Sequence, residues 1–118
     1  MMGWAALLCV VSILEAAAGS YVMTDSNIRT AVWDWLSDSA AAEAMYGHIS
    51  TWETSGVTDM KNLFCATSWS SSCNAAASSF NEDIGAWDTS GVTTMEYMFQ
   101  TSAFNQNIGA WDLSLIHI

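Results

Sequence analysis

The chain has 118 residues, a length that favours a single domain. It carries only 2 Lys or Arg residues against 12 Asp or Glu residues, so its net charge is −10. Nucleic acid and anionic membrane surfaces are therefore disfavoured as partners, because both need clustered cations. Apolar residues make up 52% of the chain and charged residues 12%, a composition that argues against disorder.

An apolar run from Trp4 to Leu14 is followed by small residues at positions 16–20. This order is typical of a secretory signal peptide, which we expect over residues 1–18, and the run is too short to span a bilayer. The segment before the run lacks the Lys or Arg that a signal peptide usually has, so a buried first helix is the alternative. A lipoprotein anchor at Cys9 is less favoured, because no small-residue motif precedes it.

Residues 24–46 are predicted to form an N-terminal helical cap made of two helical pieces. Apolar residues recur there at helical spacing along one face, and Thr24, Asp25 and Ser26 are N-cap candidates. Because the end of a solenoid exposes an apolar layer, an amphipathic terminal element is expected to cover it. The alternative is a helix that binds a peptide independently.

Residues 45–112 repeat. Phe104-Asn105 follows Phe80-Asn81 by 24 residues, and a fixed period of about 20 to 50 residues is the signature of a stacked repeat protein. We distinguish two full copies and a partial third one. The first copy covers residues 45–64, the second starts at residue 80 and the third at residue 104, and an insertion at residues 65–79 separates the first two. Asn81 and Asn105 are either ladder residues, which would bond to the backbone of a neighbouring copy, or simple turn residues.

Each copy is expected to contain a short strand around Ile-x-x-Trp, a turn at Asp-Thr-Ser-Gly and a short helix that ends near Phe99 in the second copy. These dimensions predict an α/β fold, a leucine-rich-repeat-like solenoid of about 24-residue repeats with an N-terminal helical cap. The recurring apolar positions are predicted to form the repeat core. They are Ile49, Trp52, Val57, Met60, Leu63, Phe64, Phe80, Ile84, Trp87, Val92, Met95, Met98, Phe99, Phe104, Ile108 and Trp111.

Cys65 and Cys73 lie in the insertion, which places 15 residues between Phe64 and Phe80 where the next copy has 4. The two cysteines are candidates for a disulfide that would tie down this loop, and an even count fits an oxidising compartment. Two free thiols are the alternative. A zinc site is disfavoured, because two cysteines without paired histidines do not supply four ligands.

No catalytic residue, metal or cofactor is expected from this sequence. The strongest enzymatic alternative is Cys65 as a nucleophile with His48 as its base, but Cys65 has a nearer partner in Cys73. Calcium could bind weakly to carboxylates on turns. However, Glu82 and Asp83 become Gln and Asn in the next copy, so a repeated ligand set is not kept.

The tryptophans fall into two groups. Trp52, Trp87 and Trp111 recur with the repeat, so we expect burial between copies rather than stacking on sugars. Trp33 and Trp69 are better candidates for exposure, because one lies off the apolar helix face and the other lies in the insertion.

The run Phe80 to Phe99, FNEDIGAWDTSGVTTMEYMF, closely resembles the BspA-like surface repeat of the DUF285 family. The resemblance covers about residues 24–112, and the first copy departs from it at Met45, His48 and Leu63. It implies a leucine-rich-repeat-like solenoid on the outside of a cell, with adhesion or host contact in a few members. It brings no catalytic residues.

We therefore expect a non-enzymatic secreted or cell-surface protein that binds an extracellular protein or glycan, and the alternative is a structural spacer of a cell wall or extracellular matrix. Further repeats of the same chain are expected partners, and membrane contact would need a downstream anchor. Residues 113–118, LSLIHI, leave the repeat pattern and resemble translated sequencing adapter. We accordingly expect the chain to be a fragment of a longer array.

Overall fold

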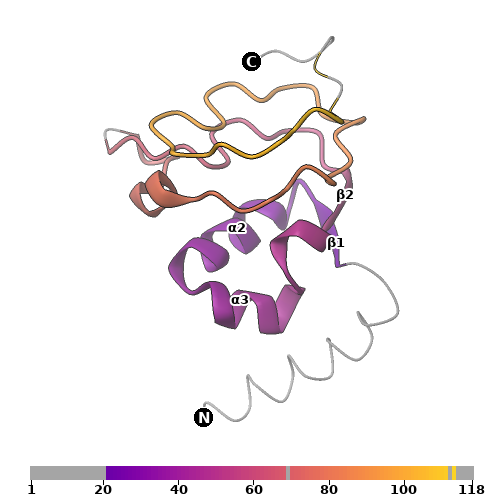
Figure 1. Cartoon of the computed structure of the whole chain (residues 1–118), viewed down its shortest axis with the longest axis horizontal. Helices are drawn as coiled ribbons and strands as arrows, with labels where there is room; N and C mark the ends of the chain where they lie inside the picture. The colour runs from indigo at the N-terminus through magenta and orange to yellow at the C-terminus, as the bar shows by residue number, and fades with distance from the viewer. Residues whose placement is uncertain (1–20, 69, 112, 114–118) are drawn as a thin grey trace.

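The structure is a computed structural model that describes residues 21–68, 70–111 and 113. Two helices lie together on one side, and the repeat segments lie beyond them (Figure 1). The elements, in chain order, are strand β1 (Val22–Thr24), helix α2 (Ile28–Ser37), helix α3 (Ser39–Tyr46), a 3-10 turn (Ile49–Thr51), strand β2 (Glu53–Gly56) and a second 3-10 turn (Ala75–Ser79).

Helices α2 and α3 form the helical part of the chain. Helix α2 begins after Asn27, four residues later than the start of the predicted cap, because residues 22–24 form strand β1 instead. The prediction of an N-cap at Thr24, Asp25 or Ser26 is therefore wrong. Asp38 separates the two helices with an extended backbone, and its side chain accepts a hydrogen bond from the Ala41 N–H at the start of α3.

A small parallel sheet joins the N-terminal segment to the first repeat copy. Strand β1 pairs with β2 in the register Val22 to Glu53 and Thr24 to Gly56. The Glu53 N–H also donates to the Tyr21 carbonyl at 2.8 Å. This pairing supplies backbone partners for the edge of the first copy that faces the helices.

A ladder of backbone hydrogen bonds connects the first two repeat copies. The N–H groups of residues 60, 62, 64 and 66 donate to the carbonyl oxygens of residues 94, 96, 98 and 100, over distances of 2.8 to 3.0 Å. Both segments advance by two residues per bond, so they run parallel. The insertion between them does not disturb this register.

Aromatic rings stack at equivalent positions of successive copies. The Phe64 and Phe99 ring centroids are 5.6 Å apart, and those of Phe80 and Phe104 are 6.0 Å apart. Within each turn, the Phe64–Phe80 and Phe99–Phe104 pairs both stack at 4.2 Å. The same aromatic geometry is therefore built twice, although 15 residues separate the first pair and 4 separate the second.

The short helix expected to end near Phe99 does not form. Residues 96–101 are a series of turns, in which the Met98 N–H donates to Met95 and the Gln100 N–H to Tyr97. Tyr97 has a φ of 59°, a left-handed conformation that a right-handed helix cannot contain. Asn62, the equivalent residue of the first copy, has a φ of 62°. Turns with spacing close to three residues bury the same positions that a helix would bury.

The strand expected around Ile-x-x-Trp in each copy does not form there. In the second copy, the Trp87 N–H donates back to the Ile84 carbonyl, which makes a tight turn. Strand β2 begins after Trp52 in the first copy, and the next parallel bridge joins Asp59 to Thr94. The extended parts of the repeats thus lie after the Trp rather than around it.

The repeat positions named from the sequence form most of the apolar core. Thirteen of the sixteen are buried, and Phe99, Phe104 and Ile108 are partly buried against that core. The cap adds Met23 and the apolar face of α2. One continuous core therefore joins the helices to the repeats.

The expected signal peptide over residues 1–18 and Trp69 lie outside the described residues, as does the tail apart from Leu113. Within the described part of the chain, neither helix has the length and apolar character needed to cross a membrane.

Candidate functional site

A cleft of about 450 Å³ lies between helix α2, the turn at residues 59–63 and the loop of the insertion. Helix α2 supplies Arg29 and Trp33 to its lining, and the turn supplies Asp59, Lys61, Asn62 and Leu63. Ser71 and Ser72 line it from the insertion. We call this space the cation cleft, because Arg29 and Lys61 are the only Lys or Arg residues of the chain. Its volume falls in the range of small-molecule sites.

Arg29 ties helix α2 to the turn. Its guanidinium donates to the Lys61 carbonyl at 2.7 Å and to the Asp59 carbonyl at 3.3 Å. It also pairs with the Asp59 carboxylate at 3.2 Å. These bonds hold the cleft floor in one arrangement, because a planar guanidinium has fixed donor directions.

Trp33 provides the exposed aromatic surface of the cleft. It lies one helical turn after Arg29, so both side chains project from the same side of α2. Its side chain is 46% exposed, whereas Trp35, Trp52, Trp87 and Trp111 are buried. Trp33 is therefore the one exposed tryptophan among the described residues, as its position off the apolar face predicted.

The loop of the insertion is closed by a disulfide between Cys65 and Cys73. Cys65 is buried, and its carbonyl accepts a hydrogen bond from the Asn74 N–H at 2.9 Å. Ser71 and Ser72 lie inside this closed loop. The disulfide thus holds the two serines at the cleft by shortening the free length of the loop.

Each cation of the cleft is paired with a carboxylate. Arg29 faces Asp59, and the Lys61 ammonium lies 3.4 Å from the Glu96 carboxylate. Asp25 also lies beside Arg29 and accepts a hydrogen bond from the Asp59 N–H. The cleft presents hydrogen-bond donors and acceptors together, and its cations are already paired.

The other titratable candidates do not gather into a site. His48 lies 3.5 Å from Glu82 and contacts the Ser50 hydroxyl, while the Asp83 carboxylate accepts from the Gly85 N–H in a local turn. Cys65, the alternative nucleophile, is bonded to its disulfide partner. The described residues contain no group of three or more His, Cys, Asp or Glu side chains that could hold a metal ion.

Two carboxylates on turns have lowered pKa values. Hydrogen bonds from the Thr58 hydroxyl and N–H lower the pKa of Asp25, which holds the N-terminal segment against the first copy. Hydrogen bonds from the Ser90 side chain and N–H lower the pKa of Asp88. The Asp88 bond is local and the Asp25 bonds span 33 positions, but in both cases hydrogen bonds donated to the carboxylate favour its charged form.

Asn81 makes the contact expected of a ladder residue. Its side-chain oxygen accepts from the Asn105 N–H at 2.7 Å, and its carbonyl accepts from the Gln106 side chain at 2.9 Å. Both bonds run from the third copy to the second. The polar side chain therefore replaces the backbone ladder that joins the earlier copies.

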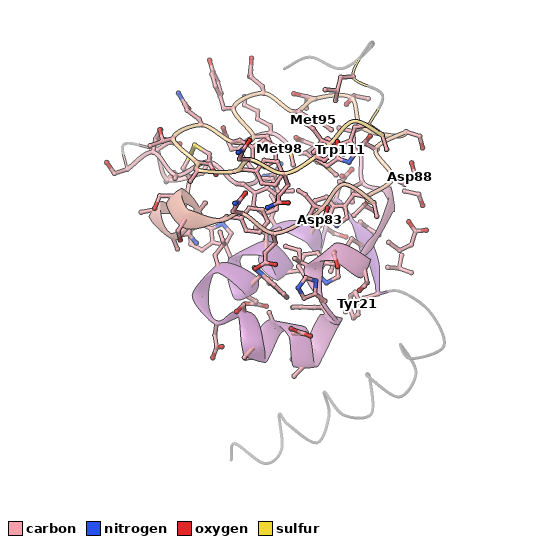
Figure 2. The ribbon with its side chains drawn as sticks, in the orientation of Figure 1. Tyr21, Asp83, Asp88, Met95, Met98 and Trp111 are labelled. Carbon is pink, nitrogen blue, oxygen red and sulfur yellow. A yellow bond between two sulfur atoms is a disulfide. The ribbon has the colours of Figure 1, made fainter. Side chains whose placement is uncertain are left out.

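A smaller apolar cavity of about 220 Å³ lies beside Trp111. Met95, Met98 and Trp111 lie on the side of the molecule away from the helices, whereas Tyr21 lies beside them (Figure 2). Trp111 is buried, but its indole N–H has no hydrogen-bond partner among the described residues. The equivalent N–H of Trp87 donates to the Ile49 carbonyl at 2.8 Å.

The repeated segment matches a family model. The model for a Mycoplasma protein of unknown function, DUF285, matches residues 40–117. The chain belongs to the DUF285 family. This match confirms the resemblance seen in the sequence. Comparisons with curated proteins and with solved structures found no match.

The cation cleft of this DUF285 protein was not predicted from the sequence, apart from the exposure of Trp33. The only hint in the sequence was the scarcity of cations, and the structure brings both of them to one place. Lys61 and Arg29 lie 32 positions apart, and nothing in the repeat pattern links them. Their proximity depends on how α2 packs on the first copy.

Proposed function

We propose that this DUF285 protein is a non-enzymatic secreted or cell-surface protein that binds an extracellular protein or glycan through the cation cleft. The observation that carries the proposal is an exposed tryptophan beside mixed polar groups on a rigid floor. Binding sites typically combine a few placed polar groups with an aromatic surface. The closed loop fits an extracellular setting, since disulfides persist in oxidising compartments.

We also propose that the repeats form a leucine-rich-repeat-like solenoid with the two helices as its N-terminal cap. The parallel ladder between residues 60–66 and 94–100 supports this arrangement, as does the repeated Phe stacking. Strand β1 and helix α2 cover the side of the first copy that would otherwise be open. Stacked repeats need such terminal caps.

The binding proposal is tested by presenting the labelled full chain to immobilised extracellular-matrix proteins and to a printed oligosaccharide array. Saturable binding that Ser71→Gln weakens is expected, because the longer side chain would fill the cleft from the loop. Glu43→Gln serves as a control, since it is a polar change on α3, outside the cleft lining. Absence of saturable binding to either surface would remove the proposal.

The alternative proposal is a structural spacer of a cell wall or extracellular matrix. The apolar cavity beside Trp111 favours it, because further repeats could pack there as the second copy packs on the first. A spacer would bind no soluble ligand at the cleft, and Ser71→Gln would then leave all measured interactions unchanged. Export is tested separately by comparing secretion of the full chain with that of a variant lacking residues 1–18.

A further inference from the structure

We infer that the ligand of the cation cleft is an uncharged saccharide whose pyranose ring stacks on Trp33, an inference that rests on the proposed binding function. The apolar face of a sugar ring needs a flat, exposed aromatic surface, and Trp33 provides one at the cleft wall. No other described tryptophan is exposed enough to serve.

The polar lining suits hydroxyl groups. A sugar hydroxyl both donates and accepts, so it needs both kinds of partner within reach. Asp59 accepts, Lys61 donates, and Asn62, Ser71 and Ser72 do both. Asn62 is also fixed in its backbone, because its left-handed φ of 62° belongs to the ladder geometry.

The electrostatics select against an anionic ligand. Both cations of the chain already face carboxylates, Arg29 with Asp59 and Lys61 with Glu96. An acidic sugar or an acidic peptide would displace these pairs while approaching a chain of net charge −10. A neutral ligand avoids that repulsion, and its binding should depend little on salt.

The rigid floor favours a small ligand over a protein surface. Arg29 binds two carbonyls of the turn, and the disulfide closes the loop that carries the serines. A cleft of about 450 Å³ has the size of a small-molecule site, whereas standard protein interfaces bury about 800 Å² per partner. Pre-organised walls also reduce the entropy lost when a ligand binds.

The test uses the full chain on an array of neutral oligosaccharides that end in glucose, galactose, mannose or N-acetylglucosamine, with uronic-acid and sulfated oligosaccharides as the anionic arm. We expect binding to at least one neutral class. Trp33→Ala should weaken it about tenfold or more, and Trp33→Phe should retain part of it. Met45→Ala, which removes an exposed apolar side chain from α3, should leave it unchanged.

Changing salt from about 50 to about 500 mM should alter the dissociation constant of a neutral ligand less than twofold. Circular dichroism and thermal unfolding check that Trp33→Ala is folded. If Trp33→Ala does not fold, Ser71→Gln, which changes the insertion loop instead of α2, takes its place in the binding test. Binding that is confined to the anionic arm, that falls steeply with salt, or that survives both variants would overturn the saccharide inference. If the chain binds matrix proteins but no oligosaccharide, only this inference fails. If it binds neither, the binding function fails as well.

Discussion

Replacing Trp87 with Phe is a direct test of how the repeat copies hold together. The Trp87 side chain is 3% exposed, stacks on Trp52 with ring centroids 6.1 Å apart, and donates its indole N–H to the Ile49 carbonyl at 2.8 Å. Phe keeps a ring in this position but cannot donate. The Ile49 carbonyl would then lose its shorter hydrogen bond and keep only the one from the Trp52 N–H, at 3.4 Å.

The magnitude follows from two losses. The loss of one of the two hydrogen bonds to the Ile49 carbonyl costs about 0.5 to 1.5 kcal/mol. A phenyl ring is smaller than an indole, and a residual void of roughly 40 Å³ adds about 1 kcal/mol. The expected decrease in the free energy of unfolding is therefore about 1.5 to 2.5 kcal/mol, a large part of a typical domain's stability.

The assay is urea unfolding of the full chain, followed by far-ultraviolet circular dichroism. Two matched variants separate the loss of the hydrogen bond from the effect of replacing a tryptophan with phenylalanine. Trp33→Phe changes an exposed tryptophan and should cost less than about 0.5 kcal/mol. Trp111→Phe changes a buried tryptophan whose N–H has no partner among the described residues, so it should cost clearly less than Trp87→Phe. Equal costs for all three variants would refute the reasoning.

Three further predictions concern the loop, the turns and pH. Reducing the disulfide should lower the free energy of unfolding by about 2.5 kcal/mol in the chain-entropy model, measured by urea unfolding with and without reductant. Gly85→Ala should lower the free energy of unfolding by about 1 to 3 kcal/mol, because its new methyl group would overlap the Asn107 carbonyl oxygen. Gly56→Ala is the control, since its methyl group would meet only ordinary contacts. Equal denaturant midpoints for the two variants would contradict this prediction. Because the pKa of Asp25 is lowered in the folded state, its contribution is present above an unfolded pKa of about 3.9 and is lost as pH falls through the folded value. Thr58→Val removes the hydroxyl that contributes most to this shift, so its loss of stability relative to wild type should be present at neutral pH and shrink as pH falls through the folded pKa of Asp25. A loss of stability that does not change with pH would contradict the assignment.

Periodicity predicted what is buried better than it predicted backbone conformation. The positions of Ile84, Trp87 and Met95 in the core follow from their recurrence alone, because a repeated unit buries the same face each time. Apolar spacing of three and four residues led to the expectation of a helix before Phe99. The left-handed Tyr97 shows that successive turns satisfy that spacing equally well.

For the helical cap, too, the sequence predicted the buried face better than the bounds of the element. The apolar spacing from Ile28 onward predicted α2, whereas the start of the helix was misplaced because Thr24 pairs in β1. A strand of three residues is decided by its distant partner and not by local propensity. The cation cleft could not be predicted from the sequence for the same reason, since Arg29 contacts residues about 30 positions away.

The insertion at residues 65–79 has a consequence for how such chains can vary. Phe64 and Phe80 stack at the same 4.2 Å as Phe99 and Phe104, so the spacing of the rings does not depend on the number of residues between them. Loop lengthening costs little free energy once both ends are anchored. This corner of the repeat is thus a natural position for grafting foreign peptides without disturbing the stacked rings.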